Sequence, residues 1–386
     1  MIHPLHKENM LTHKHQMFYD ESNNFRKLIL DKEIRSLNID RPEFNNSIFY
    51  LGGIAFKYGC NNELEIERAY FDFKNTVNKT KEELKFDDVA QNDFFSVLKS
   101  PHLYKFLKLL VTHEVCIHYQ SIDMIYMVVT DLIDEYEVIG LFYKLYPMYT
   151  FELGSSNICA YFKNVLQKVF NENKATFFDF IGRTNFPQIS DSEKFIIEFI
   201  EFIKSIRTDE NRNKISMILN VFENIEDKGS IFIDGYPEPE NNLILVNSFS
   251  GMYCHRIATL SNCIHIFDEE EGIQDAVIEM NKNSDTKIGF VDSIADFRIQ
   301  MSDIMIGFVR KFTDYHLTES FETIRNNFYK MNPFQKQCIG NYLKLEDYSE
   351  DICEFFFLAV LPLSDKEKMC KVAHFYKTEL GLKANI

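Results

Sequence analysis

Four acidic side chains stand where a site for divalent cations would need them. Asp20 follows a short strand-like run at residues 16–19, Glu83 lies near the end of a predicted helix, Asp268 follows a late predicted strand, and Asp303 lies on an apolar helix. Carboxylates that follow strands converge at one edge of an open α/β sheet. Their oxygens are the ligands that Mg²⁺ and Mn²⁺ prefer, and two such ions about 4 Å apart stabilise the attacking and leaving oxygens of a phosphoryl displacement.

Other charged residues could belong to this site or form ion pairs with its acids. Lys85 could orient a water molecule or neutralise a phosphoryl oxygen, and Glu21 and Asp292 are second-rank candidates. Each acid also has a structural interpretation, because an Asp after a strand commonly forms a turn or caps a helix. Asp303 is the hardest to explain in this way, since a carboxylate on a buried helix needs a partner or a metal. Either Lys85 or Arg298 could be that partner, in a purely structural ion pair.

Hydrophobic periodicity identifies the elements that must position these residues. A polar stretch at 24–46 predicts a loop, and the alternation of strands and helices elsewhere predicts an α/β fold with a mixed sheet. Strands are predicted at residues 16–19, 48–56, 115–119, 262–267 and 287–291, and helices at residues 63–81, 93–110, 273–280 and 299–313.

The middle of the chain has a different pattern of apolar residues. Apolar residues recur there at helical spacing, and glycine and proline in the stretch 229–239 mark its end. The predicted domains are a flexible tail at 1–15, an α/β domain formed by 16–123 and 243–320, a helical insertion at 124–242, and a helical C-terminal segment at 321–386.

Composition limits the classes of function. The chain has 386 residues and a net charge of −16, so any contact with nucleic acid must be local or supplied by a partner. The 8 cysteines form no CxxC pair, which argues against a zinc knuckle or a redox dithiol and favours reduced thiols in a cytoplasmic protein. The apolar run 355–363 is too short to cross a bilayer, so we expect no membrane contact. Abundant Phe, Ile, Asn and Lys without Trp are typical of an AT-rich bacterial genome.

Four short motifs in order resemble the bacterial domain-of-unknown-function family 3800. They are Asp20-Glu21-Ser22, Glu83-Leu84-Lys85, the strand that ends at Asp268, and Gln300 to Asp303 followed by Gly307. The resemblance covers roughly residues 16–125 and 243–313. Two positions depart from the family pattern, since Asn23 replaces a glycine and Ser302 replaces an alanine.

This resemblance implies an RNase H-like sheet and a metal-dependent nuclease that acts on RNA or DNA, of the kind found in phage-defence settings. Asp20, Glu83, Asp268 and Asp303 would then be ligands for Mg²⁺ or Mn²⁺, and Lys85 a catalytic helper. The alternative is a non-catalytic binding or regulatory subunit that uses the helical insertion for contact with a protein partner or a second copy. A third interpretation combines the two: the chain would be a defence-system effector whose nuclease becomes active when it assembles.

Overall fold

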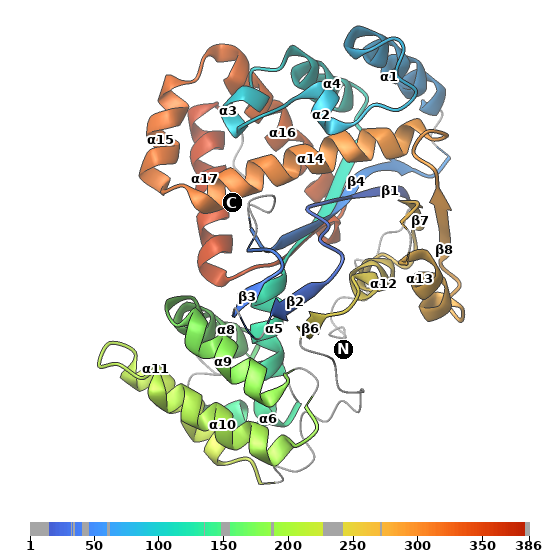
Figure 1. Cartoon of the computed structure of the whole chain (residues 1–386). Helices are drawn as coiled ribbons and strands as arrows, with labels where there is room; N and C mark the ends of the chain where they lie inside the picture. The colour runs from blue at the N-terminus through green and yellow to red at the C-terminus, as the bar shows by residue number, and fades with distance from the viewer. Residues whose placement is uncertain are drawn as a thin grey trace.

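A six-stranded mixed sheet forms the centre of the computed structural model (Figure 1), in which residues 15–31, 33, 35–40, 46–59, 62–134, 136–147, 155–186, 189–226, 242–270 and 272–382 are described. Its strands are β1 (His15–Ser22), β4 (Ile48–Lys57), β5 (Cys116–Asp123), β7 (Ile264–Asp268), β8 (Lys287–Val291) and β9 (Phe357–Val360). Their order is β8-β7-β1-β4-β5-β9. Strand β4 is antiparallel to β1 and β5, whereas β7 runs parallel to β1 and β8, and β9 runs parallel to β5. The predicted α/β class with a mixed sheet is confirmed.

Side chains of β1 alternate between two hydrophobic cores, as the pleat of a strand requires. Met17 and Tyr19 join one core and Phe18 joins the other. The core that contains Phe18 also contains buried residues of helices α1 (Glu63–Val77), α2 (Phe86–Val89), α3 (Phe94–Val97), α4 (Pro101–Thr112), α14 (Phe297–Thr318), α15 (Phe321–Lys330), α16 (Pro333–Ile352) and α17 (Leu363–Glu379). The other core contains α5 (Met124–Asp134), α6 (Tyr136–Leu145), α8 (Ser155–Glu172), α9 (Lys174–Thr184), α10 (Ser192–Ser205), α11 (Arg212–Glu223), α12 (Ser250–Thr259) and α13 (Gln274–Asn281).

The predicted loop at 24–46 is wrong, because it contains two strands. Strands β2 (Leu28–Asp31) and β3 (Ser36–Leu37) pair with each other, and β6 (Asn242–Val246) completes a second, antiparallel sheet in the order β3-β2-β6. Leu28, Leu30 and Leu37 are buried there. The partner of β2 lies so far along the chain that local periodicity could not reveal it.

Two further expectations need correction. The C-terminal segment is not wholly helical, since β9 adds an edge strand to the main sheet beside β5. The helix predicted at 93–110 is two helices, α3 and α4. Pro101 has no N–H for a helical bond, so it fits only the first turn of α4, where the Ser100 hydroxyl accepts the N–H of Leu103.

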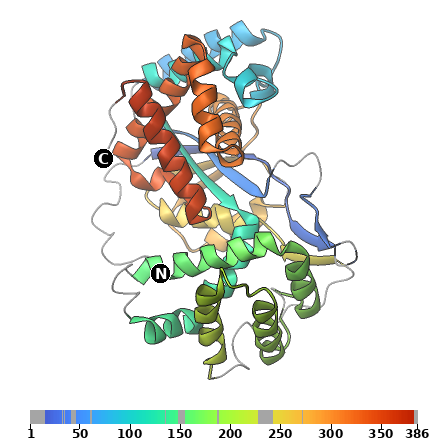
Figure 2. The ribbon, with the colours of Figure 1, turned by 90° about the vertical axis from the view of Figure 1, so that its left-hand side faces the viewer.

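Helices α5, α6 and α8 to α11 lie between β5 and β6 in the chain, at the opposite end of the molecule from α1–α4 (Figures 1 and 2). Helix α17 contacts α8, so the C-terminal segment touches this helical region. The predicted boundary at 229–239 and residues 1–14 of the predicted tail lie outside the described residues, whereas His15 is buried in β1. The division into domains stays a prediction.

No described helix combines the length and apolar character needed to cross a bilayer. The described cysteines form no disulfide bonds, and five of them, at 116, 159, 263, 338 and 353, are buried.

Helix α14 packs closely against the sheet and against α2, because a glycine lies at each of these two contacts. A Cβ at Gly53 of β4 would overlap the side chain of Ser302 on α14, and a Cβ at Gly307 of α14 would overlap the ring of Phe86 on α2. The Ser302 hydroxyl uses the close approach: it donates to the carbonyl of Phe18 at 3.0 Å and accepts the N–H of Ile54 at 3.3 Å. Small residues therefore fix the distance between α14, the sheet and α2.

We expect Gly307→Ala to lower the free energy of unfolding by about 1–3 kcal/mol, because the added methyl group overpacks the contact with Phe86. Chemical denaturation measures the change. Gly140→Ala is the matched control in the exposed interior of α6, where an added Cβ meets nothing within 4 Å and where alanine favours the helix by roughly 1 kcal/mol. Equal effects of the two substitutions would contradict close packing at Gly307.

Candidate active site

Strand register brings two of the predicted acids to one edge of the sheet. Tyr19 of β1 pairs with Phe267 of the parallel strand β7, so Asp20 and Asp268 are the next residues along neighbouring strands. Val291 of β8 pairs with Asp268 in turn, which places the residues after β8 at the same edge. Asp20 lies within β1 and Asp268 is the last residue of β7, rather than after these strands as predicted, but both lie near the carboxyl ends of parallel strands, where such side chains gather.

Asp303 reaches Asp20 from α14, which packs across β1 and β4. Its Oδ2 accepts the backbone N–H of Phe86 at 2.5 Å, so the start of α2 is tied to the same carboxyl group. Asp303 also lies within hydrogen-bonding reach of Asp20. Because neither carboxylate has a proton when ionised, a hydrogen bond between them requires that one of the two is protonated.

The loop between α1 and α2 contributes the other two predicted residues. Glu83 lies in this loop rather than in a helix, and Lys85 comes directly before α2. The ammonium of Lys85 contacts Glu83 Oε1 at 2.5 Å, and the hydroxyl of Ser293, just after β8, donates to the same oxygen. Lys85 also interacts electrostatically with Asp20, Asp303 and Asp268, so the five predicted residues form one electrostatic group.

Gln300, one turn before Asp303 on α14, holds this loop in place. Its side-chain oxygen accepts the backbone N–H of Leu84 at 3.1 Å and the hydroxyl of Tyr70 at 2.8 Å. Its amide donates to the carbonyl of Ser293 at 2.7 Å. One buried carboxamide therefore links α14, α1 and the loops that contain Glu83 and Ser293.

The pKa of Asp20 is raised well above its ordinary value. Burial is the main cause, and the negative charges of Asp303 and Glu21 add to it, while Lys85 opposes them. Asp20 exposes only 6% of its surface, and its Oδ2 is buried without a hydrogen-bond donor in the described part of the chain. Burial also raises the pKa of Asp303, against the effects of Lys85 and the Phe86 N–H. Burial and the nearby carboxylates therefore outweigh the opposing charge of Lys85 at both groups.

Two more carboxyl groups near this pair have raised pKa values. Burial raises the pKa of Asp268 to about 6, with Lys85 opposing the shift and Glu83 adding to it. Burial, together with Glu270 and Asp268, raises the pKa of Glu21 to about 8. A carboxyl group with a pKa near neutrality is suited to exchange protons at physiological pH.

Lys85 and Glu83 shift in the opposite sense because they form an ion pair. Burial disfavours the charge on Lys85, but its bond to Glu83 and the charges of Asp20 and Asp303 outweigh burial and hold its pKa above the ordinary value. Burial likewise opposes the charge on Glu83, yet Lys85 and Ser293 keep its pKa below the ordinary value. Lys85 is therefore the main positive charge that faces these acids.

The donor chemistry of this site suits a hard divalent cation, since it offers carboxylate oxygens, one of them buried and without a donor. Within the described residues, however, no group of three or more His, Cys, Asp or Glu side chains is arranged to hold one ion. Asp20, Asp303 and Asp268 are the residues that would hold it. Glu83 is already bonded to Lys85 and Ser293.

The remaining candidates have structural partners. Asp292 is exposed and accepts the N–H of Ile294, which is the turn-forming role weighed for such residues. Arg298 bonds to Asp296 at 2.6 Å and Glu63 at 2.5 Å, so it is not the partner of Asp303. Of the two partners that the sequence offered, Lys85 is the one that the structure places near Asp303.

Asn23, one of the two departures from the family pattern, fits its position for a physical reason. Its φ of 59° lies in the left-handed region, which glycine adopts freely and which asparagine tolerates better than most residues. Its amide donates to the carbonyl of Ile48 at 2.7 Å, so the side chain also secures the turn after β1.

Sequence reasoning missed the partners that organise the site. Ser293 gave a signal, since it follows Asp292 directly after a predicted strand that ends at the same sheet edge. Gln300 is part of one of the four motifs, but nothing in the sequence indicated its role. The N–H of Phe86 could not be recognised from the sequence, because every residue except proline has a backbone N–H and the residue type does not show which of them bonds to the site.

We expect Gln300→Leu to lower the free energy of unfolding by about 2 kcal/mol or more, because it leaves buried polar groups of Leu84, Tyr70 and Ser293 without a partner. Denaturant titration measures this loss. Gln91→Leu, at an exposed position, should change the same quantity by less than about 0.5 kcal/mol. A Gln300→Leu protein as stable as the parent would show that the bonds of Gln300 do not hold the loop.

Stability should also depend on pH through Asp268. A carboxyl group whose pKa is about 6 in the folded chain, against about 3.9 when unfolded, binds more protons in the folded state between these values. Its contribution is therefore present below pH ~4 and lost as the pH rises through ~6. We expect Asp268→Asn, in chelator-containing buffer, to gain about 1–3 kcal/mol relative to the parent at pH 8 and almost nothing at pH 4.

The matched control is Asp72→Asn, which removes one exposed acid from α1. Its difference from the parent should stay small at every pH. A constant loss of stability in Asp268→Asn across the same range would mean that the carboxylate makes favourable bonds, and the raised pKa of this carboxyl group would be wrong.

Comparison of the chain with protein-family models, curated proteins and solved structures gives no match. The resemblance to family 3800 therefore stays a prediction that rests on four motifs. What this chain does must be inferred from the geometry and charge of the site at the edge of its sheet.

Proposed function

We propose that this chain is a metal-dependent nuclease that hydrolyses phosphodiester bonds of RNA or DNA. One observation carries the proposal: three aspartates from β1, β7 and α14, one buried and two partly buried, lie at one sheet edge, where burial and neighbouring carboxylates raise their pKa values against the opposing charge of Lys85. Folding places acids in such surroundings at a cost in stability, and residues of this kind are typical of catalytic sites.

The strand order supports an RNase H-like sheet, the fold that the resemblance implies. Such a sheet joins three antiparallel strands to two strands that run parallel to the first, which is the arrangement of β1, β4, β5, β7 and β8. Strand β9 and the helices between β5 and β6 are additions to that pattern.

Asp20, Asp303 and Asp268 are the proposed ligands of Mg²⁺ or Mn²⁺, and Glu83 is the fourth ligand that the motifs predict. A bound divalent ion would supply activation of water and neutralise negative charge on the phosphodiester. The excess of carboxylate charge favours any cation at this edge.

The chain's own residues supply the remaining chemistry. Lys85, held by Glu83, places an ammonium group beside the aspartates, where it can stabilise charge on a phosphoryl oxygen. Asp268 has a pKa of about 6 in the metal-free chain, so protons would compete with the cation for this carboxylate as the pH falls through that value. Gln300 positions the loop that contains Lys85 through the N–H of Leu84.

The net charge of −16 means that substrate contact must be local. We propose that access is restricted by the helical insertion, or by a protein partner or second copy bound to it. A cytoplasmic role in bacterial phage defence is the setting that the resemblance implies.

The alternative proposal is a non-catalytic subunit, and one observation favours it. Lys85 already stands among the acids as a counter-ion, so the group could be a structural ion network. Under that proposal, divalent metal would not stabilise the protein, and the helical insertion would be the functional surface.

We expect Mn²⁺ to bind saturably, to raise the melting temperature and to support cleavage of labelled RNA or DNA by the full chain. Asp303→Asn should remove the metal response and lower the cleavage rate by at least about 100-fold while the protein stays folded. Calorimetric titration and a cleavage assay measure the two effects.

Asp72→Asn serves as the control, since it removes an exposed acid far along α1, and it should behave as the parent protein does. Absence of Mn²⁺ binding by the folded parent would favour the non-catalytic subunit. Binding without cleavage of any nucleic acid would retain the metal site and reject the nuclease.

A further inference from the structure

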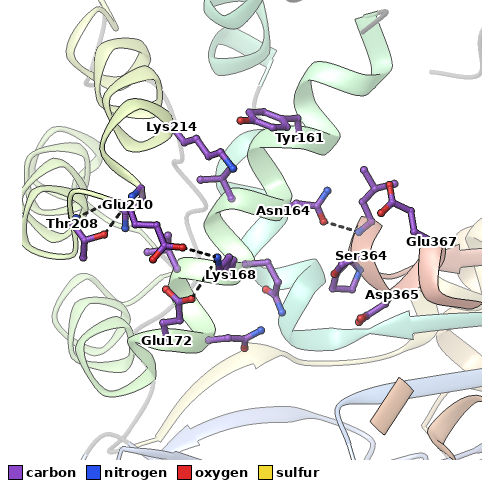
Figure 3. Close-up of a pocket in the computed structure, with 17 residues that line it drawn as sticks. Tyr161, Asn164, Lys168, Glu172, Thr208, Glu210, Lys214, Ser364, Asp365 and Glu367 are labelled. Carbon is purple, nitrogen blue, oxygen red and sulfur yellow. Dashed lines mark hydrogen bonds and ion pairs between the residues drawn. The ribbon is translucent and has the colours of Figure 1, made fainter. Parts of the chain in front are cut away.

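A cavity of about 520 Å³ lies between the helical region and the start of α17 (Figure 3). Helix α8 lines it with Tyr161, Asn164 and Gln167, the segment before α11 lines it with Glu210, and the first turns of α17 complete it. The N–H of Leu363 donates to the side chain of Asn164 at 2.6 Å, which ties the two walls together. The volume is that of a small-molecule site.

Gln167 is an unexplained polar group in this cavity. Its side chain is 5% exposed, and its Oε1 is buried without a hydrogen-bond partner in the part of the chain that the structure describes. A buried acceptor without a donor costs folding free energy, of the order of 1–3 kcal/mol, so it needs an explanation. A ligand that donates an N–H bond would provide one.

The charges around the cavity indicate which ligand. Its lining contains the acids Glu172, Glu210, Asp365 and Glu367 but only the lysines Lys168 and Lys214, which gives a net charge of −2.

Figure 3 shows the acids in two groups, with Glu172 and Glu210 around Lys168 on one side and Asp365 and Glu367 on the other. Lys168 lies 3.9 Å from Glu172 and 3.8 Å from Glu210, too far for strong hydrogen bonds. Acceptors therefore remain at both ends of the cavity.

One more feature favours a cation over an anion. Burial and the charge of Asp123 raise the pKa of Asp365, and Lys368 only partly opposes them. A positive ligand would stabilise the ionised form of Asp365, whereas a phosphate would meet an excess of carboxylates.

We propose that this cavity binds a linear organic cation with two or more ammonium groups, such as a polyamine. One ammonium would lie between Asp365 and Glu367, the other would lie near Glu172 and Glu210, and an N–H group would donate to Gln167. The proposal does not depend on the nuclease site. Because the cavity joins α8 to α17, its ligand would strengthen the contact between the helical region and the C-terminal segment.

Spermidine is the probe, tested by calorimetric titration of the full chain in 0.15 M salt. We expect one saturable site and affinity at least ten-fold weaker in Asp365→Asn, with no such change in Asp351→Asn, which removes an exposed acid at the end of α16. Weak binding at many sites, equal in the parent and both variants, would mean attraction to the acidic surface and would overturn the proposal.

Gln167→Leu separates a ligand-binding role from a structural one. We expect it to raise the melting temperature of the ligand-free protein, because it removes an unpaired buried acceptor, and to abolish the stabilisation by spermidine. A lowered melting temperature with the spermidine response retained would overturn the role of Gln167. Stabilisation by adenosine monophosphate or by a basic peptide, without any by spermidine, would overturn the ligand class.

Discussion

The close approach of α14 to the central sheet is the constraint on which the candidate site depends. Gly53 leaves room for Ser302, and Gly307 leaves room for Phe86, so one helix lies against both the strands and the loop before α2. Any increase in side-chain volume at these contacts would move Asp303 away from Asp20. The absence of a side chain at these two glycines therefore determines where Asp303 lies relative to Asp20.

This arrangement holds like charges together against their repulsion. The hydrophobic cores on both faces of the sheet supply the stabilisation, and the bonds of Gln300 and Phe86 keep the loop from relaxing away. Lys85 offsets part of the charge, and burial prevents water from screening the rest. Such a site is more stable when a cation or a proton is bound than when it is fully ionised, so its occupancy and the stability of the fold are linked.

The sequence predicted the main-sheet elements well because their periodicity is local. Residues 287–291 are β8 as expected, and β1, β4 and β7 differ from prediction only at their ends. It also placed Asp20 and Asp268 near the carboxyl ends of neighbouring strands, although both residues lie within β1 and β7 rather than after them. It failed for β2 and β3, whose burial depends on the distant strand β6, and for β9, whose four residues join the sheet beside β5. The position of Ser293 after a predicted strand was a signal, but its bond to Glu83 and the bond of the Phe86 N–H to Asp303 could not be predicted, because both join segments far apart in sequence.

The pairing of β1 with β7 has a consequence for synthesis of the chain. Gln16 pairs with Ile264, so the central strand keeps one open edge until the ribosome has made residues well past the helical region. At about 5–20 residues per second, this delay lasts about 10–50 s. Strand β4 can cover one edge of β1 early, and β5 can follow, but the other edge stays open to pairing with foreign strands. The helices between β5 and β6, whose contacts are mostly with one another, can fold during that interval. The nascent chain is therefore a candidate client for chaperones that bind exposed apolar strands.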